Sequence, residues 1–199
     1  MRQILLMGVV SLVLLTSCAT SHNRTREISE GYRIYDITGT ADHSRIVSKL
    51  KEAVQTHTDK AVFQNKIPPH PLPKQAGRFQ LTSPFAKSGL GALVAAQGGA
   101  RIPKCDNAIF TAYANDRFEG SERTTFFVCL LPYEAGYHLD VYYTFTKSSG
   151  GFGARALGQA LARSVLGDSS QFIPRTLAAL ETAAQEAGGG VKLLESYPQ

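Results

Sequence analysis

The stretch TTFFVCLLPYEAGYHLDVYYTFT, residues 124–146, consists of two segments rich in β-branched and aromatic residues on either side of a turn-forming sequence, PYEAG. In its second half, two sets of side chains alternate with a period of two. This pattern is typical of a strand with one packed and one solvent-facing side. A third segment of similar composition lies just upstream. We therefore predict an antiparallel meander of three strands over residues 108–114, 124–131 and 137–146.

Patterns elsewhere in the chain add helices and further strands. Apolar residues at helical spacing predict a helix over residues 46–57, which Thr40 or Asp42 would cap, and another over residues 173–184. Shorter helical patterns cover residues 87–97 and 157–165. Segments rich in β-forming residues predict additional strands at 32–37, 61–67, 78–81 and 191–197.

The order of these elements indicates the fold class. A run of strands followed by two helical patterns argues against alternating βαβ architecture. We expect a single α+β domain, with a mainly antiparallel sheet of five to seven strands and helices packed on one face. The proline-rich run PPHPLP, residues 68–73, excludes helix and central strand. It is either a connection crossing the domain surface or a rigid recognition loop.

The amino terminus has the pattern of a secretory signal. Arg2 precedes an apolar run over residues 4–15, which ends in Leu15-Thr16-Ser17-Cys18. The run is too short to cross a bilayer, which takes about 20 apolar residues.

The sequence LTSC at residues 15–18 resembles the lipobox of bacterial lipoproteins. The resemblance implies that residues 1–17 are a cleaved signal peptide and that Cys18, carrying palmitate-like acyl chains, becomes the first residue. Residues 18–31 would then be a lipidated flexible tether before a periplasmic domain over residues 32–199. Ala19 stands where an aspartate would indicate retention at the inner membrane, so the resemblance implies the outer membrane. The alternative is an ordinary secretory signal, with Cys18 incidental.

Two further cysteines, Cys105 and Cys129, would meet an oxidising compartment, where an even pair predicts a disulfide. A strand register centred near Arg117 would set them opposite each other, and a shifted register would separate them. The alternative is a thiol nucleophile, for which Cys129, His138 and Asp140 form the only Cys/His/Asp constellation. The apolar neighbours of Cys129 argue against it, because they raise the pKa of a thiol.

The predicted solvent-facing side of residues 137–146 carries His138, Asp140, Tyr142 and Thr144. Mixed aromatic and polar groups on an open sheet suit contact with a glycan or a protein. The alternative is a solvated face, or one covered by a helix. The glycine-rich segment 147–153 could hold an anion, but it lacks the spacing of a phosphate-binding loop.

The net charge and the motifs of the chain limit the classes of function that are possible. The net charge of +5 is mild. For an exported protein it suits anionic glycans or lipid head groups better than nucleic acid. The chain has no H-E-x-x-H or G-x-S-x-G motif, so we expect no metal, no cofactor and no identifiable catalytic residue. The sequence therefore predicts a non-enzymatic lipoprotein that binds, scaffolds or assembles an envelope protein or anionic glycan. The alternative is a periplasmic hydrolase acting on an envelope polymer.

Overall fold

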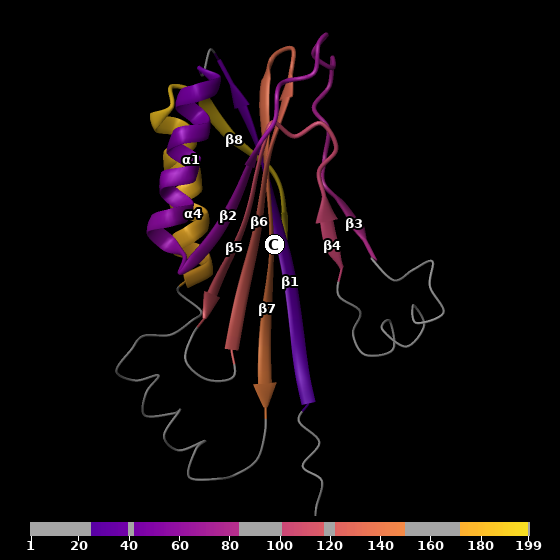
Figure 1. Cartoon of the computed structure of the whole chain (residues 1–199), viewed down its shortest axis with the longest axis vertical. Helices are drawn as coiled ribbons and strands as arrows, with labels where there is room; N and C mark the ends of the chain where they lie inside the picture. Colours follow the sequence, from indigo (N-terminus) through magenta and orange to yellow (C-terminus); the bar gives the residue numbers. More distant parts are fainter. Residues whose placement is uncertain (1–24, 40–41, 84–100, 118–121, 150–171, 199) are drawn as a thin grey trace, which may run out of the picture.

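A six-stranded antiparallel sheet, with strand order β2-β5-β6-β7-β1-β8, forms the centre of the computed structural model (Figure 1). The structure describes residues 25–39, 42–83, 101–117, 122–149 and 172–198. Two helices, α1 (His43–His57) and α4 (Phe172–Glu186), accompany the sheet, and β3 (Gln80–Thr82) pairs separately with β4 (Ile102–Lys104). The six strands are β1 (Thr25–Thr38), β2 (Lys60–Asn65), β5 (Phe110–Arg117), β6 (Glu122–Tyr133), β7 (Gly136–Ser149) and β8 (Gly190–Tyr197).

The coarse prediction of a sheet-dominated α+β fold is confirmed. Strands β5, β6 and β7 form the predicted meander, although Pro132 and Tyr133 belong to β6, so the hairpin loop is shorter than PYEAG. The helices predicted over residues 87–97 and 157–165 lie outside the described residues, as does Cys18.

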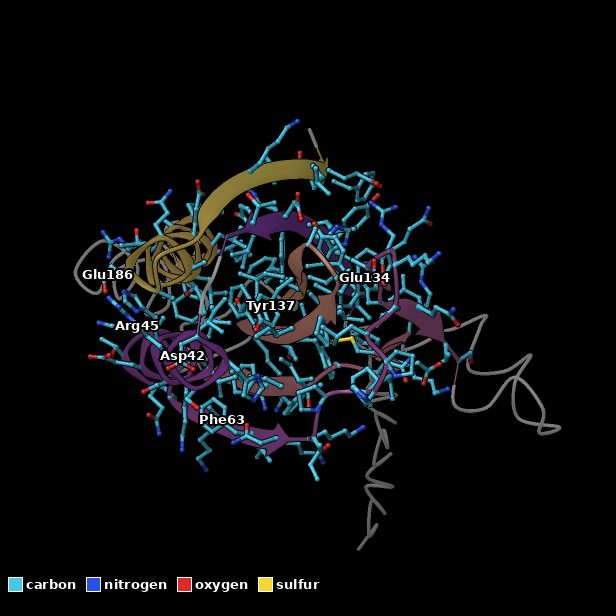
Figure 2. All side chains as sticks on the ribbon, turned by 90° about the horizontal axis from the view of Figure 1, so that it is seen from above. Asp42, Arg45, Phe63, Glu134, Tyr137 and Glu186 are labelled. Atoms are coloured by element: carbon cyan, nitrogen blue, oxygen red, sulfur yellow. A yellow bond between two sulfur atoms is a disulfide. The ribbon has the colours of Figure 1, made fainter. Side chains whose placement is uncertain are left out.

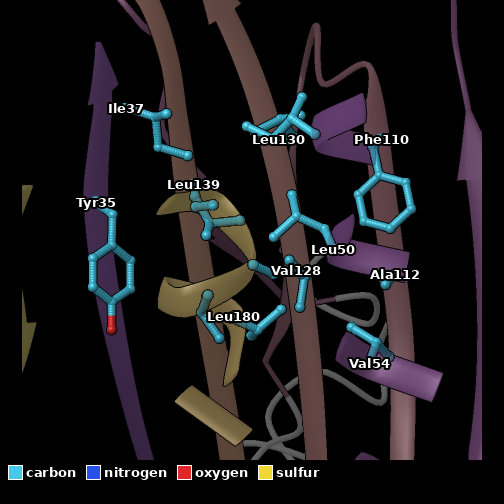
Figure 3. Packing of buried hydrophobic residues seen from close by; sticks show 14 of the residues in the cluster. Tyr35, Ile37, Leu50, Val54, Phe110, Ala112, Val128, Leu130, Leu139 and Leu180 are labelled. Carbon is cyan, nitrogen blue, oxygen red and sulfur yellow. The ribbon is translucent and has the colours of Figure 1, made fainter. Parts of the chain in front are cut away.

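One hydrophobic core joins both helices to the strands (Figure 3). The α1 helix begins where the Asp42 side chain accepts a hydrogen bond from the Ser44 backbone N–H at 2.9 Å, so the cap is Asp42, one of the two residues that the sequence offered. Its apolar positions then fall on one side. We call the strand residues in this cluster the core face of the sheet. The fully buried members include Ile37, Ile46, Leu50, Phe110, Phe126, Leu130, Leu139 and Leu180.

The first strand begins earlier than predicted. It runs from Thr25, where it pairs with Ser149, and stays in register with β7 as far as Thr38. The prediction of a flexible tether is therefore wrong for residues 25–31, while residues 18–24 lie outside the described residues. This pairing is made by backbone hydrogen bonds to β7, a strand of equal length. Backbone hydrogen bonds do not depend on side-chain type, so the sequence of residues 25–31 shows no alternation that would predict a strand there.

Gly136 begins β7 with a φ of +155°. A Cβ built there would overlap the carbonyl oxygen of Ile37 and lie 3.1 Å from its carbonyl carbon.

We therefore expect Gly136→Ala to lower the free energy of unfolding by about 2 kcal/mol, measured by urea denaturation. The control is Gly188→Ala, at φ +96° with nothing within 4 Å of the added carbon. This control carries only the backbone cost, about 1 kcal/mol. Equal losses in the two variants would rule out the clash with Ile37.

Candidate functional site

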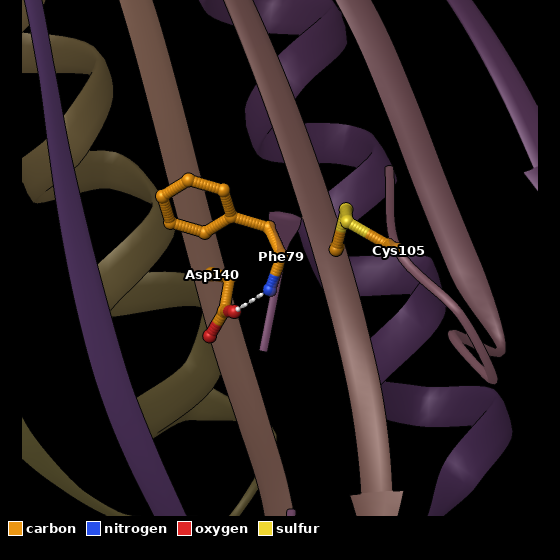
Figure 4. Close-up of a disulfide and its surroundings, with 4 residues drawn as sticks. Phe79, Cys105 and Asp140 are labelled. Carbon is orange, nitrogen blue, oxygen red and sulfur yellow. Dashed lines mark hydrogen bonds between the residues drawn. A yellow bond between two sulfur atoms is a disulfide. The ribbon is translucent and has the colours of Figure 1, made fainter. Parts of the chain in front are cut away.

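The strand residues that alternate with the core face point to a second side of the sheet, part of which is covered by the chain between β2 and β5. We call residues 66–83 and 101–107 the arm, and the side they cover the arm face. A disulfide links Cys105 of the arm to Cys129 of β6 (Figure 4). The Phe79 backbone N–H donates to Asp140 Oδ2 at 2.8 Å, and the Glu134 N–H donates to the carbonyl of Pro73 at 3.0 Å. These three contacts help to attach the arm to β6, to β7 and to the turn between them.

Two ion pairs at the margin of the arm add to these contacts. Arg78 pairs with Glu195 of β8 at 2.5 Å, and Arg101 pairs with Glu30 of β1. The arginine side chains are 49% and 53% exposed, and exposed pairs contribute about 0–1 kcal/mol each. The disulfide and the buried hydrogen bond to Asp140 therefore contribute more to holding the arm.

The disulfide prediction is confirmed, but the register that would have set the two cysteines opposite each other is not the one that forms. In the β5–β6 register, Cys129 lies opposite Thr111, and Arg117 pairs with Arg123. Cys105 precedes β5 and reaches Cys129 from the arm, with 6.3 Å between the two Cα atoms. In this form the Cys129 sulfur is bonded to Cys105, so it is not available as the nucleophile of a Cys129/His138/Asp140 site.

The face proposed as an interaction surface is less exposed than predicted. Asp140 is 1% exposed and Tyr142 is 2% exposed, while His138 and Thr144 are half-buried. The cause is Phe79 of the arm, whose ring centre lies 5.7 Å from that of Tyr142. The expectation of a solvent-facing surface is therefore wrong at Asp140 and Tyr142. A binding role for the four residues stays a prediction.

Burial changes the acid–base properties of this face. It raises the pKa of Asp140 to about 6, although the Phe79 N–H and the Arg78 charge oppose that shift. Burial also lowers the pKa of His138, against the attraction of Asp36, whose Oδ1 lies 3.9 Å from Nε2. Among the described groups, Asp140 Oδ1 and His138 Nδ1 find no hydrogen-bond partner. Burial therefore disfavours the charged form of both groups, although Asp140, with a pKa of about 6, is still mostly ionised at pH 7.

Tyr133 shows a third effect on the same face. Its hydroxyl donates to Asp36 Oδ1 at 2.6 Å, and this hydrogen bond raises the pKa of Tyr133 to about 12. Tyr133 therefore acts as a structural donor, and its proton is held too firmly for proton transfer near neutral pH.

The register of all six strands aligns aromatic side chains across the arm face. Ring centres are 4.8 Å apart between Tyr113 and Phe127, and 6.0 Å apart between Tyr32 and Tyr197. These residues lie side by side across the six strands, and we call them the aromatic row. The residues two positions away along each strand, on the same face, are mostly polar, and we call them the polar row. In strand order, the aromatic row is Val62, Tyr113, Phe127, Tyr142, Tyr32 and Tyr197, and the polar row is Gln64, Thr111, Cys129, Asp140, Ile34 and Glu195.

The arm covers the middle of both rows and leaves their β2 end open. A hollow of about 330 Å³ lies there, between β2, β5, β6 and the part of the arm that carries Cys105. Val62 is 62% exposed and Tyr113 is 39% exposed. We call this hollow the groove. The residues that matter for its chemistry are Val62, Gln64, Lys66, Lys104, Thr111 and Tyr113.

A wider hollow of about 500 Å³ lies between α1 and α4. Alanines line much of it, and Lys49 and Glu186 at its margin form an ion pair at 2.9 Å. His57 lines it as well, with Nδ1 3.0 Å from the carbonyl of Ala53. This hollow lacks an aromatic surface, so the groove is the better candidate site.

Sequence reasoning did not identify the groove. The signal was present in β2, where Ala61 and Phe63 pack against the core while Val62 and Gln64 are exposed. Such alternation indicates an open side but not which residues of other strands lie beside it. Only the register shows that Val62 adjoins Tyr113 and that Gln64 adjoins Thr111.

Comparison with known proteins adds no family: no protein-family model matches the chain, and no curated protein matches it. In the part of the chain that the structure describes, no helix has the length and apolar character needed to cross a membrane. Within the same residues, no cluster of histidine, cysteine, aspartate and glutamate could hold a metal ion.

Proposed function

We propose that this chain is a lipoprotein of the bacterial outer membrane, anchored through acylated Cys18, whose periplasm-facing domain binds an envelope component without turning it over. The observation that carries the binding role is the groove. There, exposed apolar and aromatic side chains adjoin polar ones on a sheet whose neighbouring surface the arm covers. Small-ligand sites combine these features.

The disulfide supports export. Disulfides persist in oxidising compartments such as the periplasm and are rare in the cytosol. Cys105 and Cys129 are joined, which leaves Cys18 as the remaining cysteine of the chain, at the position where a lipobox requires one.

The arrangement of layers supports a binding surface on the arm face. We propose that α1 and α4 together cover the opposite face of the sheet. Their buried side chains share one core with the core-face residues of the strands. Figure 2 draws the two helices side by side on the left and the arm on the right, with the sheet between them. On this arrangement, ligands approach from the arm side.

The lipid anchor is tested by Cys18→Ala. We expect this variant to accumulate as unprocessed precursor and to incorporate no labelled palmitate, because the acylated thiol is missing. The control is Ser17→Ala, which keeps a small residue before Cys18 and should be labelled normally. Equal palmitate incorporation in the wild type and Cys18→Ala would disprove the anchor.

The binding role is tested by photo-crosslinking in intact envelopes. A crosslinking amino acid replaces Tyr113 in the groove or, as a control, the exposed Lys192 on β8. Capture of a defined envelope component from Tyr113 alone supports binding. Turnover of an envelope polymer by the pure protein, without such capture, would favour the hydrolase alternative instead.

A further inference from the structure

We propose that the groove binds a carboxylate-bearing sugar unit of an envelope glycan, with the pyranose ring over Tyr113 and Val62 and the carboxylate at Lys66. This inference rests on the proposed binding function and names the ligand class for the same site. It is carried by the size of the groove, the order of its two rows and its charge.

The size favours a small group over a protein surface. The groove encloses about 330 Å³, at the lower end of the range of about 300–1,000 Å³ for small-ligand pockets. A stable protein partner would need about 800 Å² of surface on each side. The arm, attached through Cys105, interrupts the arm face beside the groove. One or two units of a chain therefore fit this hollow better than a folded domain.

The order of the rows matches the two kinds of surface on a sugar. Val62 and Tyr113 lie opposite each other in the aromatic row, and Gln64 and Thr111 lie opposite each other in the polar row. Successive residues on one side of a strand are about 7 Å apart, which is close to the width of a pyranose ring. Its C–H face can contact the Tyr113 ring while its hydroxyl groups reach the Gln64 amide and the Thr111 hydroxyl.

The charge selects an acidic sugar. The charged residues that line the groove are Lys66, Lys104 and Asp106. Lys104 and Asp106 form an ion pair at 2.9 Å, and no ion pair is found for Lys66 among the described residues. One ammonium group is thus left for a ligand anion. A single carboxylate on each unit complements it, whereas a phosphate-rich ligand would leave negative charge unmatched.

The distance between the groove's row and the start of β1 favours a glycan over a lipid head group as the ligand. The aromatic row crosses β1 at Tyr32, seven residues beyond Thr25, or about 23 Å along the strand. β1 begins at Thr25, seven residues after Cys18. On the proposed anchor, the groove therefore lies away from the end of the sheet that is nearer the membrane.

The inference is tested by ligand-observed saturation-transfer NMR on the full, disulfide-bonded protein. The probe is an oligosaccharide of glucuronic acid, and the reference is the matched oligosaccharide of glucose. We expect binding of the acidic probe alone. Lys66→Gln should weaken it about fivefold, because one exposed charge contact is lost. Tyr113→Ala should weaken it about tenfold, because the stacking surface is lost. Lys192→Gln, the control on β8, should bind like the wild type.

Each other result overturns the inference. Equal binding of the glucose oligosaccharide excludes recognition of the carboxylate. Equal loss in Lys66→Gln and Lys192→Gln shows a non-specific charge effect. Preference for vesicles of anionic phospholipid, or for an acidic peptide, assigns the groove to another ligand class. If no sugar binds but crosslinking at Tyr113 captures a defined envelope protein, the sugar assignment fails and the proposed binding function stands. If neither occurs, both fail.

Discussion

Replacing both Cys105 and Cys129 by serine is expected to lower the free energy of unfolding by about 3.5 kcal/mol. The disulfide joins residues 24 positions apart, and the cost comes from the loop-closure entropy that the crosslink removes from the unfolded chain. The measurement is urea denaturation of the oxidised wild type and the double variant. A loss below about 1 kcal/mol would mean that other contacts fix the arm.

The same variant is expected to loosen the arm before the sheet. Without the disulfide, the arm keeps the Phe79–Asp140 and Glu134–Pro73 hydrogen bonds, the ring contact of Phe79 with Tyr142 and two partly exposed ion pairs, among other contacts. Hydrogen exchange should therefore accelerate at the Phe79 amide, while the amides of β6 and β7 stay protected. Because Pro103 and Lys104 line the groove next to Cys105, ligand binding should weaken as well.

Gly188→Ala serves as a control here too, since it lies far from the arm in the chain and has nothing around the added carbon. It should leave the exchange rate at Phe79 unchanged. Faster exchange throughout β6 and β7 in the cysteine variant would show that the disulfide stabilises the whole sheet rather than the arm.

Replacing Asp140 by Asn is expected to remove a pH dependence of stability worth about 3 kcal/mol. Burial raises the pKa of the Asp140 carboxyl to about 6, from 3.8 in an exposed chain. The folded state therefore binds the proton more tightly than the unfolded state. The stabilisation of the folded state by this protonated carboxyl is complete well below pH 3.8 and is lost as the pH rises through about 6. Above that, folding must bury a carboxylate that is 1% exposed.

The measurement is the difference in unfolding free energy between the wild type and Asp140→Asn at pH 4 and at pH 7.5. We expect this difference to shift by about 2.5 kcal/mol in favour of the variant at the higher pH, since part of the effect is already lost at pH 4. The Asn side chain keeps an oxygen that can accept the hydrogen bond from the Phe79 N–H. His138 titrates in the opposite sense, because burial lowers its pKa, but it is present in both proteins and cancels in the difference.

The matched control is Asp106→Asn, since Asp106 has an exposed side chain that forms an ion pair with Lys104. Its stability should follow the wild-type pH profile. If Asp140→Asn also followed that profile, Asp140 would be an ordinary ionised carboxylate, and the arm would be no barrier to solvent.

Local patterns predicted much of the fold. The alternation over residues 137–146 predicted β7, and helical spacing predicted α1 and α4 with their buried Leu50 and Leu180. These predictions succeed because each depends on side chains a few residues apart in one element. The export signal and the lipobox are local patterns of the same kind, and they stay predictions.

The candidate site could not be predicted in the same way. The alternation in β7 correctly separated Leu139 and Val141 from Asp140 and Tyr142, but both sets proved to be buried. What covers the second set is Phe79, some sixty residues away in sequence. Similarly, the pairing of Cys105 with Cys129 was predicted, but its route was not, because it depends on the arm crossing β6.

The sequence by itself determined the main strands of the sheet, the helices α1 and α4, and the alternation of the two faces of the sheet. Periods of 2 and 3.6 residues follow from backbone geometry within one element. Only the tertiary structure decided which polar residues are buried, that β1 starts at Thr25, and that Val62, Tyr113 and Lys66 share one groove. Register and long-range covering depend on contacts between distant segments, which no local pattern records.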